Sequence, residues 1–103
     1  MEEKRHHPRS LIRVAVTCEL PGGVTLAGTA KDISLGGMFV EAQIDTPPAF
    51  GATISVLMAL PGVKGEARLP AVVRWTKSNG FGIQFGLLGA RETHAISKLL
   101  RGG

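Results

Sequence analysis

The sequence predicts a mainly all-β domain, a small antiparallel barrel or sandwich, with one short helix at its C-terminal end. Three observations predict it. Apolar and polar residues alternate with period two over most of the chain, glycine and proline cluster between the alternating stretches, and the final segment changes to a helical period. The 103 residues, 44% of them hydrophobic, suit one domain with a single core.

Three strands are expected in the first half of the chain. Residues 12–20 form the clearest one, and a Pro-Gly-Gly turn joins it to a second strand over residues 24–31, which makes a hairpin. Turn-forming residues at 32–37 interrupt the pattern. The third strand, residues 38–43, has Phe39 on the face opposite its apolar neighbours. The apolar face of the first strand consists of Ile12, Val14, Val16, Cys18 and Leu20.

The second half supplies three more strands. Consecutive prolines at 47 and 48 mark a loop, because proline cannot donate a ladder hydrogen bond. Residues 52–60 are apolar on both faces, which predicts a buried strand, and Pro61-Gly62 turns the chain. One face of the next strand consists of Leu69, Ala71, Val73 and Trp75.

The chain ends in a hairpin and a helix. Asn79-Gly80 predicts a two-residue hairpin turn, because both residues tolerate positive φ, and the last strand follows over residues 81–85. Residues 90–101 carry apolar side chains at helical spacing, so we expect a short amphipathic helix packed on the strands.

The charge distribution favours an anionic ligand, and the composition fits the cytoplasm. The net charge is +4, with Lys4, Arg5, Arg9 and Arg13 crowded near the amino end. A single cysteine, Cys18, excludes an internal disulfide and fits a reducing compartment. No secretory signal and no apolar run of transmembrane length occur, so we expect a cytoplasmic protein without membrane insertion.

The first candidate binding cluster is the segment Arg5-His6-His7-Pro8-Arg9, ahead of the first strand. Pro8 disfavours helix at His7, so this arm is expected to be extended. Two arginines four positions apart can turn toward a common anion. Guanidinium groups bind phosphate bidentately and also match the O6 and N7 acceptors of guanine. The alternative is an ordinary solvated basic terminus.

The second cluster is Asp32-Ile33-Ser34-Leu35-Gly36-Gly37, between the second and third strands. The Asp32 carboxylate can accept hydrogen bonds from the N1 and N2 donors of guanine, a donor pair that adenine lacks. Ser34 offers a further hydroxyl. Gly36 and Gly37 are expected to adopt positive φ and to let the backbone approach a ligand closely. An ordinary turn between strands is the alternative, and both interpretations can hold together.

Together these clusters resemble the motifs of the PilZ family. Arg5 and Arg9 match its RxxxR motif, and Asp32, Ser34 and Gly37 match its DxSxxG motif. One strand hairpin separates the two motifs, as in the family. Residues 72–75 and 80–85 are similar to the family's closing hairpin, so the resemblance covers essentially the whole chain.

The resemblance implies a six-stranded antiparallel PilZ-type β-barrel with a short C-terminal helix. Residues 1–103 would form a single domain, with a ligand-binding arm over 1–10, the barrel over 11–86 and the helix over 89–101. The implied function is that of a non-catalytic receptor for cyclic di-GMP. It would relay the signal to an effector protein of motility, pilus, polysaccharide or chemosensory machinery. No metal or other cofactor is expected.

The site residues that the resemblance implies lie in the two motifs. Arginine side chains would grip phosphates and guanine edges and stack on a base, the Asp32 and Ser34 side chains would bind a guanine, and glycine main chain would approach the ligand. The full set is Arg5, Arg9, Asp32, Ser34, Gly36 and Gly37.

Two further residues are possible ligand neighbours. Lys4 takes the place of an arginine that is common before RxxxR, which leaves open whether one ligand or a stacked pair binds. Trp75 occupies a position near the purine in some relatives, whereas its alternation phase predicts core packing equally well.

Other classes fit the sequence less well. The chain contains no Ser-His-Asp signature, P-loop or metal-binding motif, so no enzyme is expected, and the spacing of His6, His7, Cys18 and His94 matches no metal site. A barrel binding RNA or single-stranded DNA would need exposed aromatic platforms. With no tyrosine, and with the phenylalanines mostly in apolar phase, no nucleic acid polymer is expected. A degenerate PilZ scaffold that binds only proteins stays as an alternative.

Overall fold

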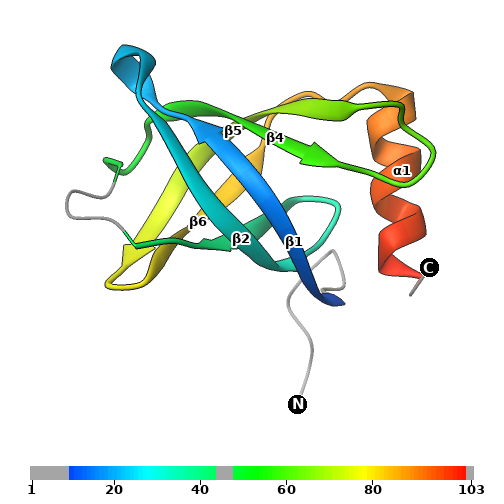
Figure 1. Ribbon diagram of the computed structural model, residues 1–103, viewed down its shortest axis with the longest axis horizontal. Coiled ribbons are helices and arrows are strands. Elements are labelled where there is room, and N and C mark those ends of the chain that lie inside the picture. The colour runs from blue at the N-terminus through cyan, green and yellow to red at the C-terminus, as the bar shows by residue number, and fades with distance from the viewer. Residues whose placement is uncertain (1–9, 44–47, 102–103) are drawn as a thin grey trace.

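The computed structural model describes residues 10–43 and 48–101 of the chain, which form a closed antiparallel barrel with an α-helix at one end (Figure 1). The strand order around the barrel is β1-β2-β3-β6-β5-β4, and β4 pairs back with β1. The elements are β1 (Ser10–Glu19), a 3₁₀ turn (Pro21–Gly23), β2 (Thr25–Ile33), β3 (Gly37–Glu41), β4 (Thr53–Ala59), β5 (Glu66–Lys77), β6 (Gly80–Phe85) and α1 (Ala90–Leu100). The predicted six-stranded barrel and C-terminal helix are confirmed.

The interior of the barrel is filled by the apolar face of every strand. Phe81 is the largest fully buried side chain, and Cys18, from the apolar phase of β1, is also fully buried. Helix α1, which stands beside the β4–β5 connection in Figure 1, adds Ala95 and Ile96 to the same core. Burial alternates along β1, β4 and much of β5 because one face must avoid water, so the barrel follows from the sequence pattern.

Irregularities in pairing change which residues face outward. Between Val73 and Trp75 the β5–β6 register shifts, so that β5 carries one residue more than β6 over this stretch. Val73 therefore points into the core, while Trp75 lies on the outer surface with 44% of its area exposed. The alternation that placed Trp75 in phase with the core does not hold through this bulge.

Two local expectations were wrong. Asp32 and Ile33 continue β2, where they pair with Phe39 and Met38 of β3, and do not belong to the turn. The β5–β6 hairpin exists, but its two-residue loop is at positions 78 and 79, because Lys77 pairs with Gly80. Neither Asn79 nor Gly80 has positive φ.

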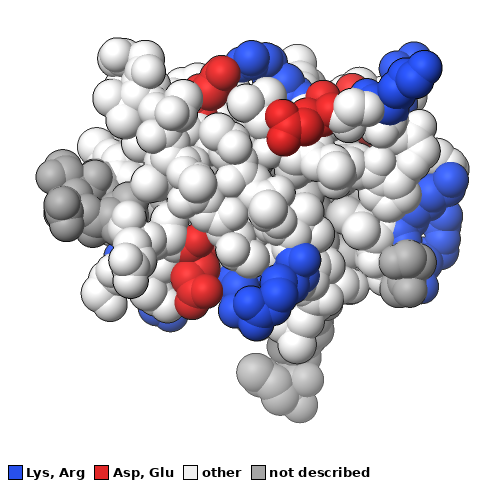
Figure 2. Space-filling view, viewed as in Figure 1, with Lys and Arg blue, Asp and Glu red and all other residues white. Residues whose placement is uncertain are grey.

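The surface of the molecule carries no large patch of one charge on the face shown in Figure 2. Acidic and basic side chains lie in small, separate groups across a largely uncharged face. Within residues 10–43 and 48–101, no helix is both long and apolar enough to cross a membrane.

Candidate functional site

A line of paired residues crosses the outer surface of the barrel. Leu11 of β1 pairs with Asp32 of β2, Asp32 with Phe39 of β3, Phe39 with Gly82 of β6, and Gly82 with Trp75 of β5. Cross-strand partners point to the same side of a sheet, so these five residues form one row, which we call the outer row. At the β1 end Leu11 is 90% exposed.

An aromatic pair occupies the β5 end of the outer row. The rings of Phe39 and Trp75 are stacked, with centroids 5.3 Å apart and planes inclined by 11°. Gly82 and Gly80 make room for them. A Cβ at Gly82 would overlap the indole of Trp75, and one at Gly80 would lie 2.8 Å from Cζ of Phe39. The ammonium of Lys77 lies 5.7 Å from the Phe39 centroid and 5.8 Å from that of Trp75.

Neither Phe39 nor Lys77 was identified as a site residue from the sequence. A signal for Phe39 was present, because it lies in the outward phase of its strand, opposite Met38 and Val40. The glycines at alternate positions 80 and 82 were a second signal, since a strand interior seldom uses glycine unless another group approaches closely. No sequence pattern pointed to Lys77 as a site residue.

The Asp32 carboxylate is anchored next to this aromatic pair. Its Oδ1 atom accepts a hydrogen bond of 3.1 Å from the backbone N–H of Phe39, and the residue is half-buried. This bond fixes the carboxylate between Leu11 and Phe39 in the outer row. The sequence-predicted acceptor for guanine thus lies on the exposed surface of the barrel, beside an aromatic surface suited to a purine ring.

The turn that follows is bonded within itself and to β6. Ser34 is buried, and its Oγ accepts hydrogen bonds from the N–H groups of Gly36 and Gly37, at 3.1 and 3.2 Å, and donates one to the Gly37 carbonyl at 3.4 Å. The Gly36 carbonyl accepts from the N–H of Phe85 at 2.8 Å. The Ser34 hydroxyl therefore shapes this turn.

The glycines of the turn do not have the backbone conformation that was expected. Neither Gly36 nor Gly37 has positive φ, so that expectation was wrong. A Cβ at Gly37 would overlap the backbone carbonyl of Ile83 in the neighbouring strand. Gly37 is thus required by the close approach of β3 to β6.

The first motif lies outside the described residues, and this applies to Lys4, Arg5 and Arg9. The chain that follows it is described. Ser10 pairs with Ile33, directly beside Asp32, and its hydroxyl donates a hydrogen bond of 3.2 Å to the carbonyl of Leu100 at the end of α1. The residue that follows Arg9 in the chain is therefore next to the second motif and in contact with the helix.

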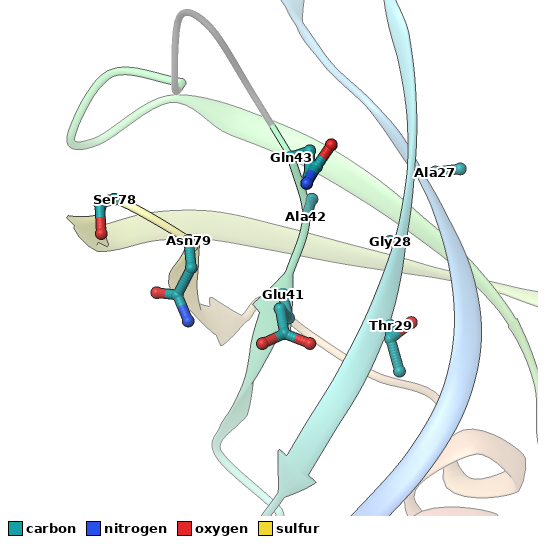
Figure 3. A pocket seen from close by; sticks show the side chains of 8 residues that line it. All are labelled: Ala27, Gly28, Thr29, Glu41, Ala42, Gln43, Ser78 and Asn79. Carbon is teal, nitrogen blue, oxygen red and sulfur yellow. The ribbon is translucent and has the colours of Figure 1, made fainter.

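A separate groove of about 570 Å³ lies where β2, β3 and the β5–β6 turn meet (Figure 3). Its one charged lining residue in the described chain is Glu41, which is paired with Lys31 at 3.5 Å. A groove with this lining does not suit an anion. Residues 10–43 and 48–101 also hold no group of three or more His, Cys, Asp and Glu side chains that could bind a metal ion. The groove is lined by Ala27, Gly28, Thr29, Glu41, Ala42, Gln43, Ser78 and Asn79.

Comparisons with known proteins identify the family and support the fold. The PilZ domain family model matches residues 3–102. The PilZ domain of CeSA from a cellulose-synthesizing bacterium is 18% identical, with a TM-score of 0.74, over 92% of this chain and 96% of that one. The PilZ domain of YcgR from Escherichia coli, solved with c-di-GMP, is 16% identical, with a TM-score of 0.75, over 97% and 91% of the two chains.

A larger protein contains the same fold as one part. The MrkH–c-di-GMP complex of K. pneumonia is 20% identical, with a TM-score of 0.71, over 98% of this chain and 52% of that one, so this chain spans about half the length of MrkH. At these identities the likeness establishes the fold. No curated protein sequence matched the chain.

Proposed function

The chain belongs to the PilZ domain family, and on that basis we propose that it is a receptor for cyclic di-GMP that relays the ligand's presence to a partner protein. PilZ domains are non-catalytic, so the chain is a binding protein and not an enzyme. The ligand would lie on the outer row, beside the aromatic pair, and the two motifs would bind it.

One observation carries this proposal: the pairing of Ser10 with Ile33 brings the chain that follows the RxxxR motif to the side of Asp32. Arg9 directly precedes Ser10 in the chain, which supports the proposal that both motifs contribute to one site. Guanidinium groups would bind phosphate and guanine edges, while the Asp32 carboxylate accepts the N1 and N2 donors of one guanine. The solved YcgR and MrkH structures contain c-di-GMP, which supports this choice of ligand.

The aromatic pair extends the proposed site toward β5. A purine that is held at one edge by Asp32 can place its face against exposed rings, and stacking on an aromatic side chain contributes about 1–3 kcal/mol per base. Trp75, at 44% exposure, is available for such contact. Trp75 thus enters the site as a stacking surface, and Phe39 supports it from behind.

The relay would begin at the arm. A nucleotide that contacts both motifs would favour the arrangement that brings them together. The Ser10 hydroxyl donates a hydrogen bond to the carbonyl of Leu100, so ligand binding at the neighbouring Arg9 would also act on the end of α1. A partner protein that recognises the arm and α1 together would distinguish the two states.

A calorimetric titration of the purified chain with cyclic di-GMP tests this function. GTP and cyclic di-AMP are the controls, because the first lacks the cyclic dinucleotide and the second lacks the guanine donors. We expect saturable binding of cyclic di-GMP alone, and the titration gives the stoichiometry. Absence of heat and of competition with cyclic di-GMP would contradict the proposal and favour the scaffold that binds only proteins.

One structural observation favours a second candidate function, the binding of single-stranded nucleic acid. The sequence predicted that phenylalanines would mostly face the core, but the half-buried Phe39 stacks on the exposed Trp75, an arrangement that nucleic-acid platforms use. The face of the molecule shown in Figure 2 carries no broad basic groove. Titration with an oligonucleotide that lacks guanine separates the two functions, because only the nucleic-acid function predicts binding.

A further inference from the structure

Lys77 lies at the edge of the proposed site, and neither motif includes it. It is the last residue of β5 and pairs with Gly80, which places it on the same outer face as Trp75. The side chain is exposed, and its Nζ atom lies above both rings of the aromatic pair, at 5.7 and 5.8 Å from their centroids. A lysine ammonium is a compact charge on a flexible stem, so it can reach several positions above these rings.

The Lys77 ammonium interacts only weakly with the groups around it. The nearest acidic residue along the strand pairs is Glu41, which pairs with Gly80 and forms its ion pair with Lys31 at 3.5 Å. Within residues 10–43 and 48–101, no carboxylate lies at ion-pair distance from Lys77. A cation over aromatic faces at an exposed position is held weakly, and a phosphate oxygen is a stronger partner.

Lys77 lies at the opposite end of the outer row from β1. From Asp32 on β2 to Trp75 on β5 there are three strand spacings, or about 14 Å at about 4.8 Å each. Ser10, which follows Arg9 in the chain, begins β1 at one end of the row, whereas Lys77 lies at the β5 end. A ligand with two phosphates that lies along the row would therefore meet Lys77 at the end of the row opposite to β1.

We infer that Lys77 is the barrel's own phosphate-binding residue. This inference rests on the proposed function and adds to it a cation from outside the two motifs. In the unliganded protein the ammonium covers Phe39 and Trp75. On binding, it exchanges the rings for a phosphate oxygen of cyclic di-GMP and exposes the indole to a guanine base.

The test compares Lys77→Gln with a control variant, Lys64→Gln. The control also removes one positive charge, but Lys64 is exposed in the β4–β5 connection, away from the outer row. Both variants and the parent chain are titrated with cyclic di-GMP at two salt concentrations. We expect Lys77→Gln to lower the affinity about tenfold and to reduce its salt dependence, because a charge-assisted hydrogen bond is lost. Lys64→Gln should stay within about twofold of the parent, since only distant screened charge changes. Equal affinities for the two variants would overturn the inference while leaving the receptor function intact.

A second measurement examines the exchange itself. Trp75 is the one tryptophan of the chain, so its fluorescence reports on the ring surface alone. The unliganded emission of Lys77→Gln should differ from that of the parent, because the ammonium has left the indole, and the two spectra should converge at saturation with cyclic di-GMP. A difference that persists at saturation, or identical unliganded spectra, would contradict the exchange. If the parent chain binds no cyclic di-GMP, the receptor function itself is wrong, and the inference is overturned with it.

Discussion

The indole of Trp75 lies over the backbone of Gly82, in the space that a side chain at position 82 would occupy. The two residues are cross-strand partners on β5 and β6, and the register shift between Val73 and Trp75 directs the indole outward at this point. The missing Cβ lets the ring lie close to the strand, where it stacks on Phe39. An exposed tryptophan is thereby kept in one position.

Gly82→Ala is expected to displace the indole and to disrupt its stacking on Phe39. Because the group that must move is an exposed ring and not backbone, we expect a loss of stability below about 1 kcal/mol, at the low end for overpacking. The Trp75 emission should shift to the red, and the affinity for cyclic di-GMP should fall. Steady-state fluorescence and calorimetry measure the two effects.

Gly86→Ala provides the control for this prediction. A Cβ at Gly86 would lie 3.5 Å from Cβ of Pro70, an ordinary van der Waals contact. That variant should keep the parent emission and affinity. If Gly82→Ala matched it in both measurements, Gly82 would not position Trp75.

Ser34→Ala should destabilise the fold because the Ser34 hydroxyl is buried and bonded within its turn. The substitution leaves the N–H groups of Gly36 and Gly37 without their side-chain acceptor. An unsatisfied buried donor costs about 1–3 kcal/mol, so we expect a loss of that size in the free energy of unfolding from urea titrations. Ser97→Ala is the control, because the exposed Ser97 hydroxyl donates only to the Thr93 carbonyl within α1. Equal stabilities of the two variants would argue against a structural role for Ser34.

Arg9→Ala and Asp32→Ala should each reduce cyclic di-GMP binding by at least about tenfold, because each removes a charged partner of the ligand. Arg91→Ala, which removes one exposed charge from the first turn of α1, is the control and should bind like the parent. Asp32→Ala also removes the bond to the Phe39 N–H and should cost about 1 kcal/mol of stability, whereas Arg9→Ala should cost less. Calorimetry and urea titration separate the effects, and parent-like affinity in either variant would contradict the proposed site.

The sequence predicted the architecture well because the alternation of apolar residues is a local pattern. It predicted less at the site, where the outcome depends on which strands become neighbours. Trp75 faces outward because of a one-residue bulge, which alternation in the sequence cannot show. Gly37 is required because of the Ile83 carbonyl, which belongs to a neighbouring strand that is distant in the sequence. Phe39 and Lys77 joined the site for the same reason, since their meeting requires β3, β5 and β6 to lie side by side.

Cys18 predicts a specific dependence of stability on alkaline pH. Burial in the barrel raises the pKa of its thiol from 9.0 to about 11, because the thiolate would lose its hydration. Below pH 9 the thiol is protonated in both the folded and the unfolded chain, so it contributes no pH dependence. Between pH 9 and 11 the unfolded chain releases the proton first, and stability falls with rising pH by up to about 3 kcal/mol.

Urea titrations at pH 8, 9, 10 and 11 measure this fall, with Cys18→Ala as the reference. That variant loses packing in the core and is less stable at every pH, so the comparison concerns the slope and not the absolute value. The chain contains no tyrosine, and lysine titration is common to both proteins. The difference between the two slopes therefore isolates Cys18. Parallel curves above pH 9 would mean that the thiol ionises as readily in the folded barrel as in the unfolded chain.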